Sequence, residues 1–135
     1  MYLLDTDTIS ALTKPAPSST LLLRIAMTAP QDRATSTVTL GELLFGAHRA
    51  GSRSAELLEL TRRTVPGEIP LLPFDQAAAE EYGWLRGYLE ERGTPIGHED
   101  TQIAAIALAN DLTVVTGNTR HFERVPGLNV ENWLE

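Results

Sequence analysis

The chain opens with a short run of large apolar side chains that ends in a carboxylate. Tyr2, Leu3 and Leu4 are followed by Asp5, and a second carboxylate, Asp7, comes two positions later. An apolar run of this length is typical of a strand that is buried on both faces, as in a parallel sheet. Ligands of open α/β sheets bind outside the carboxyl ends of the strands. We therefore expect the first strand to carry Asp5 from the core to the edge of a sheet.

Strand-like and helical segments alternate along the rest of the chain. Further strands are expected at about 33–38, 68–74, 112–116 and 128–130, and prolines in the 68–74 segment indicate an edge strand. Helices are expected at about 8–13, 19–28, 39–49, 53–64, 76–92, 101–110 and 118–124. Helical connections between strands make the strands parallel. The pattern predicts one α/β domain over 1–135, a three-layer sandwich with a central parallel sheet.

Composition narrows the possible chemistry. The chain has no cysteine, which excludes disulfides and thiolate metal sites. Its net charge of −7 argues against a broad nucleic-acid surface but permits a metal ion held by carboxylates. No apolar run is long enough to span a bilayer and no signal peptide is visible, so we expect a cytoplasmic protein without membrane contact.

Five polar residues fall where strands end or helices begin, and each has a purely structural interpretation. Asp7, Asp100 and Asn118 could cap the helices that follow them. Glu42 stands three residues after Thr39, which is the spacing of a capping box. Asp5 could be a turn residue that bonds local N–H groups. The five residues are Asp5, Asp7, Glu42, Asp100 and Asn118.

Taken together, these residues suggest a metal site. If the first, second and fourth strands are parallel neighbours, Asp5, Glu42 and Asn118 share one edge of the sheet, and Asp100 joins them if its helix starts over that edge. Converging carboxylates repel each other and raise one another's pKa unless a cation is bound. Oxygen ligands suit Mg²⁺ or Mn²⁺, which can activate water for attack on a phosphoryl group.

One alternative for this chemistry is a phosphatase. Asp5 and Asp7 form the D-x-D pair that opens haloacid-dehalogenase-type phosphatases, in which the first Asp is the nucleophile. That reaction normally uses a lysine late in the chain to balance the phosphoaspartate. The only lysine here is Lys14, which counts against this interpretation.

Four sequence blocks, in order and at matching spacing, resemble the PIN-domain ribonucleases, specifically the VapC-type toxins of bacterial toxin–antitoxin pairs. The blocks, which span nearly the whole chain, are residues 3–9 (LLDTDTI), 36–47 (STVTLGELLFGA), 93–105 (GTPIGHEDTQIAA) and 115–128 (VTGNTRHFERVPGL). Any single block is a weak signal, whereas the ordered set is specific.

The resemblance implies a fold and a set of site residues. It places the first strand in the middle of the sheet. It implies Mg²⁺, with Mn²⁺ as a substitute, held by Asp5 and Asp100, while Glu42 completes a catalytic acidic triad. Thr6 and Asn118 would orient ligands or water, and Asp7 would be an auxiliary group. Many relatives carry a fourth acidic residue where this chain has Asn118 and His121, so the number of metal ions stays open.

The resemblance also implies RNA as substrate and a VapB-type antitoxin as partner, which could block the acidic pocket with an inserted arginine or lysine. A structured, tRNA-like target would suit recognition by shape. Arg49 and Arg53 are candidates for RNA contact, although they could be ordinary solvated helix charges. A homodimer is expected, with Trp84 and Tyr88 on a candidate surface. The alternative is a catalytically degenerate PIN module that acts only by binding its partner.

Overall fold

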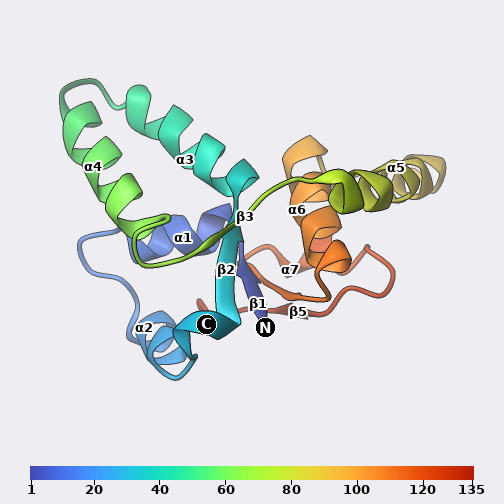
Figure 1. The fold of residues 1–135 in the computed structure, drawn as a ribbon, viewed down its shortest axis with the longest axis horizontal. Helices are drawn as coiled ribbons and strands as arrows, with labels where there is room; N and C mark the ends of the chain where they lie inside the picture. The colour runs from blue at the N-terminus through green and yellow to red at the C-terminus, as the bar shows by residue number, and fades with distance from the viewer.

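The computed structural model describes residues 1–135 and contains a parallel sheet between two groups of helices (Figure 1). The strands are β1 (Tyr2–Leu4), β2 (Arg33–Ser36), β3 (Leu71–Leu72), β4 (Thr113–Val115) and β5 (Val130–Glu131). Their order is β3-β2-β1-β4-β5 and every pairing is parallel. The predicted sandwich with the first strand in the middle is thus confirmed.

Seven α-helices surround this sheet. They are α1 (Thr6–Leu12), α2 (Ser19–Ala26), α3 (Thr37–His48), α4 (Ser54–Thr64), α5 (Gln76–Glu91), α6 (His98–Ala109) and α7 (Thr119–Phe122), with short 3-10 turns at Pro30–Asp32 and Gly51–Arg53. Figure 1 shows α3 and α4 side by side as an arm that projects from the sheet, with α5, α6 and α7 on the opposite side. No helix is both long and apolar enough to cross a membrane.

The two faces of the sheet support separate cores. Side chains alternate between the faces of a strand, so Leu3 and Val114 pack with the α5, α6 and α7 side, whereas Leu4 and Val115 pack with α1 and α2. All four are fully buried. Burying such a side chain stabilises the fold by roughly 1.5–3 kcal/mol. The double-sided burial expected for β1 is therefore present and fixes the strand that carries Asp5.

Three helices begin earlier than predicted, each for a local reason. The α1 helix begins at Thr6 because the Asp5 carboxylate accepts a hydrogen bond from the N–H of Thr8, at 2.9 Å, and so serves as its N-cap. Ser36 caps α3 through its hydroxyl oxygen in the same way. The α6 helix starts at His98, directly after Gly97, whose φ of 95° turns the chain into it. The helix predicted over 101–110 therefore begins three residues earlier, at His98.

The strands are shorter than predicted, most of all at the β3 edge. Only Leu71–Leu72 forms a strand within the expected 68–74 segment. Pro70 and Pro73 flank it and lack the N–H that a sheet ladder needs, although the carbonyl of Pro70 still accepts a bond from Thr35 at 2.9 Å. The predicted edge position of this strand is confirmed.

Candidate active site

The acidic residues meet where β1, β2 and β4 end. The backbone N–H of Asp5 donates to the carbonyl of Val115 at 3.0 Å, which fixes the first residue after β1 against the end of β4. On the other side, the hydroxyl of Thr35 donates to the Leu4 carbonyl. The start of α1 is thereby held between the neighbouring strand ends. Asp5 itself is only 3% exposed.

Burial makes the Asp5 carboxyl group a weak acid. Loss of hydration raises its pKa to about 6, from a usual value of 3.8. Hydrogen bonds from the Thr116 hydroxyl and from Thr8 lower the pKa and offset part of this effect, whereas the negative charge of Asp7 raises it. A cation beside Asp5 would favour the ionised carboxylate.

Glu42 approaches the same edge from the second turn of α3. Its Oε1 accepts a hydrogen bond from the Thr6 hydroxyl at 2.8 Å, which joins α3 to the first residue of α1. The same hydroxyl lies 3.2 Å from that of Thr39. Partial burial raises the pKa of Glu42, and the charges of Glu99, Asp100 and Asp7 raise it further. Glu42 therefore belongs to one electrostatic group with the carboxylates of α1 and α6.

Asp100 reaches this group from the first turn of α6. Its Oδ2 lies 3.4 Å from Nδ1 of His121, and that nitrogen lies 2.9 Å from the side-chain amide of Asn118. Burial raises the pKa of Asp100, while the hydrogen bond and charge of His121 lower it. The donor and acceptor roles of Nδ1 in these two contacts depend on the tautomer of His121.

The cluster has the donor chemistry of a divalent cation site. Three carboxyl groups from α3, α6 and the end of β1 all have raised pKa values, and neighbouring negative charges contribute to each shift. Such oxygen donors suit Mg²⁺ or Mn²⁺. No three acidic or histidine side chains converge closely enough to ligate one ion by themselves. Mg²⁺ commonly keeps several waters and takes one or two carboxylates, so one or two of these side chains would be enough to hold this ion.

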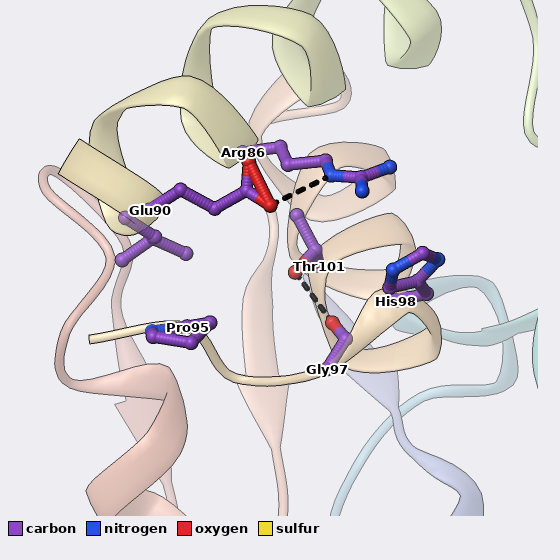
Figure 2. Close-up of a pocket in the computed structure, with 7 residues that line it drawn as sticks. Arg86, Glu90, Pro95, Gly97, His98 and Thr101 are labelled. Atoms are coloured by element: carbon purple, nitrogen blue, oxygen red, sulfur yellow. Dashed lines mark hydrogen bonds and ion pairs between the residues drawn. The ribbon is translucent and has the colours of Figure 1, made fainter. Parts of the chain in front are cut away.

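Two hollows lie near these residues. The larger, about 320 Å³, is a groove between α1, α3 and α4. Its lining includes Thr6, Asp7, Ser10, Glu42, Gly46 and Thr61. The smaller, about 70 Å³, lies between α5 and α6, where Arg86 and Glu90 of α5 point toward one another, 3.4 Å apart (Figure 2). Only the larger groove is lined by residues of the acidic cluster.

Comparison with known sequences shows the family of this chain. Residues 2–128 match the PIN domain family. The chain belongs to the PIN-domain family. It is 40% identical over 101 residues to a tRNA(fMet)-specific endonuclease VapC from Shigella flexneri, covering 73% of each chain, and 32% identical over 137 residues to ribonuclease VapC2 from Haemophilus influenzae, covering 98% of each.

Solved structures agree with this assignment. The fold of this PIN domain superposes with a TM-score of 0.90 on a chain of the DNA-bound VapBC complex from Salmonella typhimurium, at 32% identity, covering 98% of this chain and 97% of the other. The predicted family resemblance is confirmed. The haloacid-dehalogenase alternative for Asp5 and Asp7 is thereby ruled out, because the PIN match covers nearly the whole chain, including both residues.

The capping interpretations of individual acidic residues were mostly wrong for this PIN domain. Asp7 and Asp100 lie in the first turns of α1 and α6 rather than at their N-caps, which are Asp5 and Gly97. Asn118 occupies the N-cap position of α7 but its side chain makes no capping bond.

Glu42 does not form a capping box either. The N-cap of α3 is Ser36, and the Glu42 carboxylate bonds Thr6 instead. Asp5 bonds a local N–H, as its structural interpretation expected, and is also a buried carboxyl group with a raised pKa. Neither the Glu42 carboxylate nor the Asp100 carboxylate therefore caps a helix.

Sequence reasoning missed two contacts within the site. Thr116, fully buried next to the end of β4, accepts a bond from the N–H of Asn118 at 2.9 Å and lowers the pKa of Asp5. His121, rather than a fourth acidic residue, contacts Asp100. Thr116 and His121 both lie in the last of the four sequence blocks. The available signal in the sequence was the i, i+3 spacing of Asn118 and His121, which predicts that these two side chains touch each other.

The contact between His121 and Asp100 gives a testable expectation. The His121→Ala variant should raise the pKa of Asp100 further, because the histidine's hydrogen bond and charge both lower it. A ¹³C NMR titration of the side-chain carboxyl groups in metal-free protein measures this directly. His48→Ala removes an exposed histidine from the end of α3 and is the control. An unchanged Asp100 titration in His121→Ala would show that the contact does not act on the carboxylate.

Proposed function

We propose that this PIN domain is a divalent-metal-dependent endoribonuclease of the VapC type, which acts as a toxin and is neutralised by a VapB-type antitoxin. The observation that supports this most is the position of Asp5, Glu42 and Asp100, three carboxyl groups with raised pKa values, on elements that end or begin at one edge of the sheet. Relatives that cover 98% of the chain bear the name ribonuclease VapC.

Each residue of the cluster has a distinct role in this proposal. Asp5 and Asp100 hold Mg²⁺ or Mn²⁺, and Glu42 orients or deprotonates the attacking water. A bound divalent cation supplies a lowered water pKa and neutralises charge on the phosphoryl oxygens. The raised pKa of Glu42 brings this carboxylate closer to the range suited to a general base near neutral pH.

Neighbouring side chains orient these groups. The Thr6 hydroxyl holds the Glu42 carboxylate at 2.8 Å. His121, with Asn118 behind it, restrains Asp100. Such outer contacts typically change metal affinity or activity 10–100-fold when they are removed. Asp7 lines the adjoining groove and adds negative charge to the group as an auxiliary residue.

The substrate in this proposal is a structured RNA with an unpaired segment, such as a tRNA loop. One relative is named a tRNA(fMet)-specific endonuclease. Arg49 and Arg53 stand at and beyond the end of α3, on the arm that borders the groove, and are the proposed phosphate contacts. Arg53 lies 3.5 Å from Glu56 in an exposed ion pair, which costs little to open.

The proposed protein partner is a VapB-type antitoxin, since solved structures of similar chains are VapBC complexes. A cluster of carboxylates attracts an inserted arginine or lysine from such a partner. Pairing of two copies through α5 stays a prediction. Gly83 and Gly87 are exposed there, beside the edge-to-face pair of Trp84 and Tyr88, whose ring centroids lie 6.1 Å apart.

Cleavage of RNA by the purified protein tests this function. We expect single-stranded and tRNA-like substrates to be cut in Mg²⁺, to be left intact in EDTA, and to yield 5′-phosphate and 3′-hydroxyl ends. Cleavage that persists in EDTA with cyclic phosphate products would contradict the metal mechanism. Intact RNA under every divalent cation, together with tight antitoxin binding, would favour a degenerate binding module.

Metal binding can be measured without activity. A cation that binds only the folded protein raises its melting temperature, so Mg²⁺ should raise that of the wild type and have little effect on Asp5→Asn. Asp75→Asn is the matched control, because Asp75 caps α5 through a 3.0 Å bond to the N–H of Ala78 and lies outside the cluster. A wild type whose melting temperature is insensitive to Mg²⁺ would argue against the site.

A further inference from the structure

An aromatic ring and a positive charge extend along α3 from the acidic cluster. Phe45 lies one turn beyond Glu42 and is 62% exposed. Arg49 follows one turn later, with its guanidinium carbon 5.3 Å from the centroid of the Phe45 ring. Residues three or four apart are neighbours on a helix surface. Glu42, Phe45 and Arg49 therefore form one strip, about two turns or 10 Å long.

The helix leaves space open beside this strip. Gly46 lines the 320 Å³ groove together with Glu42, and a methyl group built at Gly46 would meet no atom within 4 Å. Glycine inside a helix is less stable than alanine, because it loses more conformational freedom on folding. The fold alone would therefore favour alanine at Gly46. A missing side chain at this point lets another molecule approach the helix backbone closely.

The charge of the arm favours a polyanion as the molecule that approaches. Residues 37–64, which form α3, α4 and their connection, carry four arginines against three glutamates, in a chain of net charge −7. The exposed ring offers a face for a nucleobase, and base stacking on aromatic side chains tolerates any base. Proteins recognise RNA loops largely by stacking unpaired bases in this way.

We propose that Phe45, Arg49 and Gly46 form a subsite for an unpaired nucleotide next to the phosphodiester that is cut. The base stacks on Phe45, Arg49 contacts a neighbouring phosphate, and the chain passes over Gly46 toward Glu42. This inference rests on the proposed ribonuclease function and names the part of the surface that holds its substrate. It assigns to Phe45 a contact with the base and to Arg49 a contact with the backbone.

Binding of short, dye-labelled single-stranded RNA, followed by fluorescence anisotropy in the Asp5→Asn background, tests the subsite without cleavage. Adding Phe45→Ala should weaken binding about 5- to 150-fold, the range that corresponds to one stacked base. Phe45→Trp should restore it, because a larger ring keeps the stacking face. Leu23→Ala, which removes an exposed apolar side chain from α2, should bind as the parent does. Arg49→Ala should lower the salt dependence by about 0.7, the contribution of one phosphate on a single strand.

An abasic scan of the same RNA separates stacking from a general loss of affinity. One abasic position should weaken binding to the parent and have no further effect on Phe45→Ala, because the two changes remove the same contact. Equal losses in both proteins at every position would overturn the assignment of Phe45. Circular dichroism and a thermal melt confirm that the variants are folded.

Gly46→Ala gives an independent test with a matched control. Gly41 is also in α3, also has no atom within 4 Å of a built methyl group, and does not line the groove. Both Gly41→Ala and Gly46→Ala should raise the melting temperature by roughly a few degrees. Only Gly46→Ala should weaken RNA binding. Equal RNA binding by the two variants would contradict the close approach over Gly46.

Two further outcomes are informative. If Phe45→Ala binds RNA as tightly as its parent but loses affinity for the antitoxin, the strip is a protein interface and the nucleotide subsite is wrong. Failure of the ribonuclease proposal itself would appear differently, as a wild-type protein that leaves RNA intact in Mg²⁺. The anisotropy series does not depend on cleavage, so the two failures can be told apart.

Discussion

Asp5→Asn is expected to lower RNA cleavage more than about 100-fold. Loss of a residue that only hydrogen-bonds a metal ligand already lowers metal affinity or activity about 10–100-fold, and Asp5 is proposed to be a ligand itself. The substitution should leave the fold intact, since asparagine is as good an N-cap as aspartate and can still accept the bond from the N–H of Thr8. Initial rates on a labelled single-stranded RNA at saturating Mg²⁺ measure the effect.

A control variant separates the loss of the Asp5 charge from any effect on helix capping. Asp75→Asn makes the same chemical change at the exposed N-cap of α5, and it should cut RNA at the wild-type rate. If Asp5→Asn retained wild-type cleavage, Asp5 would be only a cap, and the metal site would have to lie elsewhere.

The metal-free protein is expected to lose stability as the pH rises from about 4 to about 6. Across this range the unfolded chain has lost the Asp5 proton while the folded chain retains it, because the folded pKa is about 6 against 3.8. The folded state therefore binds more protons, and the free energy of unfolding falls with pH. Asp5 alone accounts for about 3 kcal/mol. The raised pKa values of Glu42 and Asp100 add to the fall with the same sign.

Urea unfolding in EDTA at a series of pH values from 4 to 7 measures this dependence. Asp5→Asn should show a shallower fall and exceed the wild type in stability at pH 7, because the buried charge is gone. Asp75→Asn should follow the wild type. A wild-type stability that rises between pH 4 and 6, or that runs parallel to Asp5→Asn, would show that burial does not hold the Asp5 proton.

The sheet was predictable from the sequence because its strands are short apolar runs separated by helices. Apolar side chains such as Leu3 and Val114 must be buried, so few arrangements of the helical layers around the sheet are possible. Element boundaries were less predictable, since they depend on which polar side chain captures the first free N–H groups. Asp5 and Ser36 do so here, and the sequence alone did not distinguish them from later candidates such as Asp7 and Thr39.

The placement of Asp5, Glu42 and Asp100 on elements at one edge of the sheet was predictable because parallel strands end at the same edge. The surroundings of these residues were not. Thr116 acts on the pKa of Asp5 because β1 and β4 are neighbours although they are far apart in the sequence, and this leaves no periodic pattern. The exposure of Phe45 is unusual for a large apolar side chain, although Phe45 lies outside the stripe that helical spacing turns inward, which consists of Leu40, Leu43, Leu44 and Ala47.

A Mn²⁺ titration of the purified protein, with bound ion counted by electron paramagnetic resonance and cleavage measured in the same samples, tests the central claim most directly. We expect cleavage to rise in proportion to occupancy of a site that contains Asp5 and Asp100. Both signals should be lost in Asp5→Asn and in Asp100→Asn, and retained in Asp75→Asn. Full cleavage by metal-free wild type, or unchanged Mn²⁺ affinity in Asp5→Asn, would contradict a cation held by this acidic cluster as the basis of activity.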